Sequence, residues 1–210
     1  MIRVLLADDH VIFRRGLCQI IGDAEGIEVA GEASSGAEIL QLARTLPADV
    51  LVLDISLGDR NGLDILKQVK REIPRLAVLM LSMHSEDKYA LRALRAGAAG
   101  YLNKQTAPAQ LISAIERLAH GRKYISQAVA EQLAMDVDGD SNRAPHETLS
   151  DREYETFMLI VSGMPPGEIA EKLHLSIKTI SVYRARLLEK LRVKNNVELT
   201  HYAMRHLLVE

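Results

Sequence analysis

The 210-residue sequence contains a single cysteine, Cys18, so the chain cannot form an internal disulfide and suits a reducing compartment. Long apolar runs are also missing near the N-terminus, where the longest, residues 4–7, ends at two aspartates. We therefore expect neither a signal peptide nor a membrane span, and a cytoplasmic protein with no membrane partner.

No excess of one charge marks the chain as a whole, whose formal net charge is −2. The charge is nevertheless uneven: residues 172–194 hold seven Lys or Arg and one acid, whereas residues 121–147 hold three bases and five acids. The first segment is a basic island in a near-neutral chain. The second has the composition of a flexible linker, with room for a short helix at 127–135.

The stretch Val50–Asp54 consists of four apolar residues and one acid, followed by a polar, glycine-containing loop at 55–62. A short apolar run bounded in this way is typical of a parallel strand that is buried on both faces. Similar runs, alternating with amphipathic helical segments, lie at 3–7, 27–33, 77–82 and 99–102. Five strands alternating with five helices predict an α/β fold with a doubly wound, five-stranded parallel sheet over residues 1–120.

From Leu149 onward the pattern is entirely helical. Ser150 with Glu153 forms a capping box before the first helix. A short second helix at 168–173, a tight turn, and two further helices that follow Ser176 and Asn195 complete the pattern. We expect a second, all-α domain of four helices at 148–210, with residues 121–147 as the linker.

Three carboxylates, Asp8, Asp9 and Asp54, come at the ends of two strands that should be neighbours in the sheet. Open α/β sheets place their chemistry at this edge. Unneutralised carboxylates repel one another, and hard oxygen ligands suit Mg²⁺, so we expect Mg²⁺ to be the cofactor.

Phosphoryl transfer requires an in-line nucleophile and positive charge on the equatorial oxygens. A carboxylate such as Asp54 can be that nucleophile and form an acyl phosphate. Ser82 and Lys104, at two further strand ends, supply a hydroxyl donor and a cation. An acid after a strand is most often a helix cap or a solvated group, so this interpretation depends on the joint pattern.

The segment 177–191 predicts a helix with Ile180, Leu187 and Leu191 on its buried side. A basic helix that follows a short helix and a tight turn is typical of a helix-turn-helix, whose second helix enters the major groove of double-stranded DNA. The alternative is an ordinary solvated face. The candidate DNA-binding residues are Lys178, Thr179, Ser181, Val182, Arg184, Ala185, Arg186 and Lys190.

With this arrangement, residues 1–120 resemble the receiver domain of two-component response regulators. The resemblance implies a flavodoxin-like sheet, and a sensor histidine kinase that phosphorylates Asp54. It also implies a switch in which Tyr101 moves inward when the hydroxyl residue moves toward the phosphate. The implied Mg²⁺ ligands are Asp8, Asp9, Asp54 and the backbone carbonyl of Ser56, and the implied phosphoryl contacts are Ser82 and Lys104.

Residues 149–207 resemble the LuxR-type helix-turn-helix domain, on the motifs 149–153, 168–170 and 176–191. Together the two domains resemble a response regulator of the NarL/FixJ class. This implies a transcriptional regulator that phosphorylation activates, without enzymatic turnover beyond its own phosphorylation and slow autodephosphorylation. It also implies a homodimer in the phosphorylated form, with DNA-bound contacts through Leu199, Tyr202 and Ala203 in the last helix.

Some positions depart from the family pattern. Gly58 stands where a proline is usual, and Met83 where a small residue is frequent. Pro165 and Pro166 replace polar residues before the small helix of the second domain.

Two other functions remain as alternatives. A phosphatase that turns over an aspartyl phosphate usually has a second acid two residues after the nucleophile, where this chain has Ser56. A pure interaction module, which no longer takes phosphate, is the other alternative. The intact set of three acids, a hydroxyl and a lysine argues against it.

Overall fold

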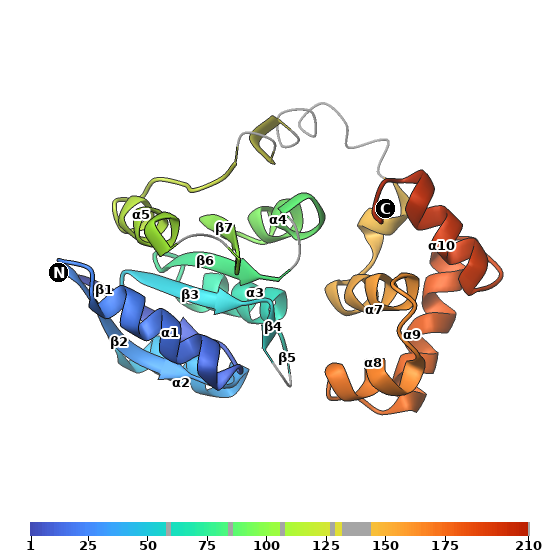
Figure 1. Ribbon diagram of the computed structural model, residues 1–210, viewed down its shortest axis with the longest axis horizontal. Coiled ribbons are helices and arrows are strands. Elements are labelled where there is room, and N and C mark those ends of the chain that lie inside the picture. The colour runs from blue at the N-terminus through green and yellow to red at the C-terminus, as the bar shows by residue number, and fades with distance from the viewer. Residues whose placement is uncertain (58–59, 84–85, 106–107, 127–128, 132–143, 210) are drawn as a thin grey trace. The chain divides into compact units, whose positions relative to one another are not determined.

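A computed structural model describes residues 1–57, 60–83, 86–105, 108–126, 129–131 and 144–209 (Figure 1). The chain separates into two compact units, Met1–Asp136 and Val137–Glu210. In the described part of the chain, no helix has both the length and the apolar character needed to cross a membrane. Gly58 and most of the segment 127–135, where we expected a short helix, lie outside the described residues.

The first unit is built on one parallel sheet with the strand order β2-β1-β3-β6-β7 (Figure 1). The predicted doubly wound sheet of five strands is therefore confirmed. The strands are β1 (Ile2–Ala7), β2 (Ile27–Ala33), β3 (Val50–Asp54), β6 (Ala77–Ser82) and β7 (Gly100–Asn103). The helices are α1 (Val11–Gly22), α2 (Gly36–Thr45), α3 (Gly62–Glu72), α4 (Glu86–Arg95) and α5 (Pro108–Ala119).

The strands carry apolar side chains on both faces of the sheet, as expected for a parallel sheet covered by helices. One face packs against α1 and α5, where Val52, Leu81 and Leu102 join Ile21 and Ile115 in a single buried cluster. Helices α2, α3 and α4 pack against strands of the same sheet. This burial fixes the register of the strands, because a slip by one residue would move each side chain to the other face.

The loop that follows β3 contains a small antiparallel hairpin, with β4 (Ser56–Leu57) paired to β5 (Arg60–Asn61). We expected only a polar loop there, because strands of two residues are too short to show an alternating pattern. Asn61 ends the hairpin and caps α3, since its side-chain oxygen accepts a hydrogen bond from the Leu63 amide at 2.8 Å. The hairpin therefore connects the end of β3 directly to the start of α3.

The segment after α5 returns to the sheet. The Tyr124 amide donates to the Ala99 carbonyl at 3.0 Å, and the Tyr124 carbonyl accepts from the Tyr101 amide at 3.3 Å. Gly100 lies between these bonds, where a Cβ would approach the Tyr124 carbonyl oxygen to 2.9 Å. Residues just beyond α5 are thus attached to the edge strand β7, although the sequence placed 121–147 in a linker.

The second unit is helical, with a 3₁₀ turn, η1 (Pro145–Thr148), before its four α-helices. Its predicted all-α fold is confirmed. Pro165 and Pro166 fit the structure, because they occupy the N-cap and first position of α8, where proline costs no hydrogen bond. The α-helices are α7 (Asp151–Val161), α8 (Pro166–Lys172), α9 (Ile177–Lys190) and α10 (Asn196–Arg205).

We predict that Gly62→Ala destabilises the first unit by about 1 to 3 kcal/mol, because a Cβ there would lie 2.1 Å from the Asp54 carbonyl oxygen. The control is Gly16→Ala in α1, where no atom lies within 4 Å of the added Cβ. That substitution should stabilise the helix by about 0.5 to 1 kcal/mol. Urea denaturation measures both changes, and a Gly62→Ala variant as stable as the parent would contradict the prediction.

Candidate functional site

The strand ends bring the predicted acidic residues together. Ala7 pairs with Leu53, and Asp54 pairs with Leu81, so Asp8 and Asp54 lie at the same edge of the sheet. Asp8 is 0% and Asp54 is 2% exposed. Two buried carboxylates in this position require a cation.

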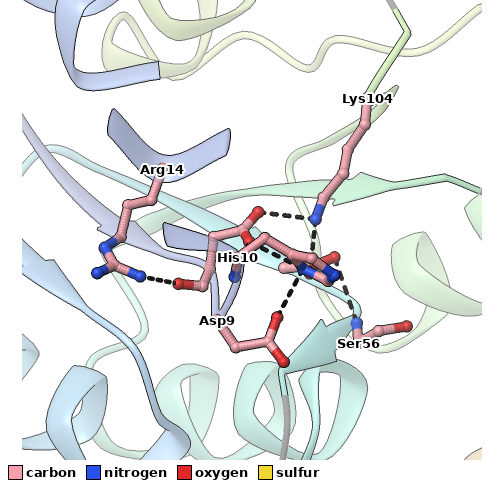
Figure 2. A network of polar contacts seen from close by, with 7 residues as sticks. Asp9, His10, Arg14, Ser56 and Lys104 are labelled. Carbon is pink, nitrogen blue, oxygen red and sulfur yellow. Dashed lines mark hydrogen bonds and ion pairs between the residues drawn. The ribbon is translucent and has the colours of Figure 1, made fainter. Parts of the chain in front are cut away.

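Lys104 provides that cation within the chain. Its Nζ lies 2.7 Å from Asp8 Oδ2 and 2.7 Å from Asp54 Oδ2, and its side chain is 4% exposed (Figure 2). The ammonium also lies over the Phe13 ring, 4.7 Å from the ring centroid. Backbone geometry supports this placement, since the Lys104 amide donates to the Ser82 carbonyl at 2.7 Å.

The third acid, Asp9, is less buried than Asp8 and Asp54 and comes close to His10 (Figure 2). His10 Nδ1 lies 2.8 Å from Asp9 Oδ1. Ligand atoms of Asp8, Asp9, His10 and Asp54 all lie within 4.8 Å of one another. A set of carboxylate oxygens at this spacing fits a hard divalent ion such as Mg²⁺.

The electrostatics of Asp54 follow from its surroundings. Burial raises the pKa of Asp54 to about 6, since the Lys104 ammonium only partly offsets desolvation and the Asp8 carboxylate adds to the rise. Ser56 lies close by, and its amide donates to Asp54 Oδ1 at 3.3 Å (Figure 2). The fold therefore keeps the Asp54 carboxylate buried at a cost in free energy. This carboxylate is available to an incoming cation or electrophile.

Ser82 lies on β6, which pairs with β3, and Tyr101 lies on β7, the edge strand that pairs with β6. Ser82 ends β6 and is 1% exposed, and Tyr101 in β7 is 2% exposed. Tyr101 pairs with Met80, and Ser82 pairs with Asn103 directly before Lys104. Ser82 and Tyr101 therefore belong to one pair of hydrogen-bonded strands, and Lys104 directly follows the second of them. Met83, directly after Ser82, is 61% exposed.

In the second unit, α9 presents one buried side and one open side. Ile180 and Leu187 are at most 1% exposed and contribute to the core of the unit. Around the opposite side of the helix, all the candidate positions are exposed: Lys178, Ser181, Val182, Ala185 and Arg186. This surface combines small side chains with cations, which permits close approach to a duplex.

Other candidates on α9 already have partners within the unit. The Arg184 Nε donates to Asn196 Oδ1 at 2.7 Å, and the Thr179 hydroxyl lies 2.8 Å from the Ser176 hydroxyl that caps the helix. Lys190 Nζ lies 2.7 Å from Glu153 Oε2. Burial tends to raise the pKa of Glu153, but Lys190 and Ser150 hold it below its usual value. Lys190 thus binds the first helix of the unit.

The three residues that we predicted for dimer contacts lie inside the unit. Leu199 and Ala203 are 0% exposed, and Tyr202 is 6% exposed, with its hydroxyl accepting a hydrogen bond from the His146 amide at 3.2 Å. Periodicity marked them as an apolar stripe but did not show that the core takes all of it. Among the apolar side chains of α10, Val197 and Met204 are exposed.

The residues Phe13, His10 and Arg14 reach the acidic site but were not assigned to it from the sequence. The available signal was their position within five residues of Asp9, around the start of a helix.

Two family models match the chain. Residues 4–116 match the response regulator receiver domain, and residues 147–203 match the bacterial regulatory proteins of the luxR family. The chain therefore belongs to the two-component response regulators, in the NarL/FixJ class that joins a receiver to a LuxR-type helix-turn-helix DNA-binding domain.

Individual relatives agree with this class. The response regulator UvrY of Escherichia coli K12 is 39% identical over 207 residues, which cover 98% of this chain and 95% of UvrY. Among solved structures, RcsB of Salmonella enterica serovar Typhimurium, bound to promoter rprA in the presence of the phosphomimetic BeF3−, matches with a TM-score of 0.64 and 29% identity. That match covers 96% of this chain and 98% of RcsB. A structure of two RcsB dimers bound to two parallel DNAs matches with a TM-score of 0.58 and 30% identity, covering 97% of this chain and 98% of that one.

We predict that Asp54→Asn stabilises the metal-free protein by about 1 to 3 kcal/mol at pH 7.5. The pKa of Asp54 in the folded chain, about 6, lies above the ordinary aspartate value of 3.8. The folded chain therefore holds a proton that the unfolded chain has released, and it loses stability as the pH rises from 3.8 to 6. Asparagine does not titrate, so the difference should disappear near pH 4. Urea denaturation in EDTA at both pH values measures it, with the exposed Glu28→Gln as control. A stability difference between variant and parent that does not change with pH would contradict the raised pKa of Asp54.

Proposed function

We propose that Asp54 accepts a phosphoryl group from a sensor histidine kinase and that this event controls binding of α9 to double-stranded DNA. The observation that carries the proposal is the shared ion pair: one buried lysine, Lys104, contacts both Asp8 and Asp54 at the carboxyl edge of the sheet. This arrangement supplies the nucleophile and a cation for the phosphoryl oxygens at a single place.

In the proposed reaction, a carboxylate oxygen of Asp54 attacks the phosphorus atom while the bond between phosphorus and the donor nitrogen breaks. The product is an acyl phosphate on Asp54, and the imidazole of the kinase leaves. Mg²⁺, held by Asp8, Asp9, Asp54 and the backbone carbonyl of Ser56, would neutralise charge on the phosphoryl oxygens when bound. Within the chain, no second acid stands two residues after Asp54, which supports a phosphoacceptor over a phosphatase with rapid turnover.

The new group requires Lys104 to change partners. Its ammonium would move from the Asp54 carboxylate to a phosphoryl oxygen, and the Ser82 hydroxyl would donate to another. Lys104 directly follows β7, and its amide donates to the carbonyl of Ser82 at the end of β6. Tyr101 lies in β7, three residues before Lys104. We therefore infer that Tyr101 and β7 report the phosphorylated state to the rest of the receiver.

For DNA, we propose that the exposed face of α9 enters the major groove. Lys178 and Arg186, both exposed, would contact phosphates, while Ser181, Val182 and Ala185 would approach base edges. The promoter-bound RcsB structure, with its phosphomimetic, supports this role by similarity. The RcsB dimers on DNA support a homodimer in the phosphorylated form.

We predict that acetyl phosphate adds one phosphoryl group to the protein in the presence of Mg²⁺ and none in EDTA. Intact-mass spectrometry measures the addition. Asp54→Asn should abolish labelling, because it removes the nucleophile, whereas the exposed Asp64→Asn in α3 should retain it. An unlabelled parent protein would favour the interaction-module alternative, and steady release of phosphate from an aryl phosphate would favour the phosphatase.

We predict that Lys178→Ala weakens binding to a duplex and reduces the slope of log affinity against log salt by about one, as expected for loss of one phosphate contact. Fluorescence anisotropy with a labelled duplex of random sequence, measured on protein treated with beryllofluoride, gives both values. Lys123→Ala removes an exposed lysine from the first unit and is the matched control. Equal losses in the two variants would exclude a specific role for this face of α9.

A further inference from the structure

Arg14 lies one helical turn after the loop that carries Asp8 and Asp9, and its side chain is 15% exposed. Its Nη1 donates to the backbone carbonyl of Asp8 at 2.5 Å (Figure 2). Its Nε donates to Glu32 Oε2 on β2 at 3.3 Å. The guanidinium thus joins the backbone oxygen of Asp8, directly after β1, to a carboxylate of the neighbouring strand β2.

The Asp8 residue is held at every polar group. Its amide donates to the Ala33 carbonyl at 3.2 Å, its Oδ1 accepts from the His10 amide at 2.8 Å, and its Oδ2 contacts Lys104. Arg14 supplies the remaining partner, the one for the carbonyl. Without Arg14, this carbonyl is the one polar group of Asp8 that loses its contact.

The carbonyl of Asp8 belongs to the planar peptide that joins Asp8 to Asp9. Fixing the direction of this carbonyl fixes the position of the Asp9 nitrogen and leaves only the torsion angles of Asp9 itself to set where its carboxylate points. Asp9 Oδ1 is buried and lies 2.8 Å from Nδ1 of His10, the next residue in the chain. Both ends of this contact belong to one loop, so the orientation of the Asp9 carboxylate depends on the backbone of that loop.

We propose that Arg14 is a positioning residue for the divalent ion: it clamps the Asp8–Asp9 peptide and thereby aims the Asp9 carboxylate into the acidic site. The inference rests on the proposed Mg²⁺ site. It assigns a role to a side chain that touches neither the ion nor the phosphoryl group, comparable with the groups that orient metal ligands in other proteins.

The sign of the effect separates this role from simple electrostatics. Arg14 carries a positive charge near a cation site, so if only its charge mattered, removing it would tighten Mg²⁺ binding. If Arg14 positions Asp9, removing it weakens binding. Replacement by lysine keeps the charge but loses the planar fork that reaches two acceptors at once, so it should also weaken binding.

The test is isothermal titration calorimetry with Mg²⁺ alone, on the full chain, without any phosphoryl donor. We expect Arg14→Met to raise the dissociation constant about 10-fold, the lower end of the range for groups that orient metal ligands. Arg14→Lys should lie between this variant and the parent. Arg15→Met is the matched control, because Arg15 lies on the same helix, is exposed, and carries the same charge; its Mg²⁺ affinity should stay that of the parent.

Unchanged or tighter Mg²⁺ binding in Arg14→Met would overturn the inference. A lower melting temperature in EDTA together with unchanged Mg²⁺ affinity would also overturn it, because that result indicates a purely structural role. If Arg14→Met fails to fold, Arg14→Lys decides, since a charge-only role predicts no change there. Parent protein that binds no Mg²⁺ would instead overturn the proposed metal site itself.

As a second readout, acetyl phosphate labelling of Arg14→Met should recover at saturating Mg²⁺. The Mg²⁺ concentration for half-maximal labelling should be raised, and the maximal labelling rate should stay near that of the parent.

Discussion

The ion pairs of Lys104 with Asp8 and Asp54 are the interaction on which the rest of the receiver depends. One ammonium faces two buried carboxylates, with a third, Asp9, close by. Desolvation makes such a group expensive, and a buried ion pair is weak evidence for stability. The pKa of Asp54 is raised for the same reason, because one ammonium does not fully offset the burial of Asp54 and the charge of Asp8. The surrounding apolar strands supply the stability that this cluster lacks.

The two units use their cations differently. In α9, Lys190 and Arg184 contact Glu153 and Asn196 and help to hold the helix in place. Lys178 and Arg186 are also exposed on this helix, and their charge can act on a polyanion. A count of basic residues cannot separate these two uses, since both give the same local charge. Only the packing of α9 against α7 and α10 decides which cations are engaged internally.

The sequence predicted the sheet well because each strand is a short buried run that ends at a polar residue, and this is a local signal. The same local signal predicted that Asp54, Ser82 and Lys104 lie at one edge of the sheet. It missed the contact between Arg14 and the Asp8 carbonyl, because nothing in a sequence marks a hydrogen bond to a backbone oxygen. The family resemblance placed Leu199 in a dimer contact, whereas Leu199 is fully buried within the second unit. Periodicity finds an apolar stripe but does not reveal which neighbour covers it.

The attachment of Tyr124 to β7 was missed for a related reason, since pairing along an edge strand depends on long-range register. Its consequence is mechanical. The Tyr101 amide donates to the Tyr124 carbonyl, and Lys104 follows on the same strand three residues later. A displacement of Lys104 therefore acts on a strand that is hydrogen-bonded on one side to β6 and on the other to the chain leaving α5. Gly100 permits the close approach, because a side chain there would meet the Tyr124 carbonyl. The acidic site and the segment that follows α5 thus contact the same edge strand, β7.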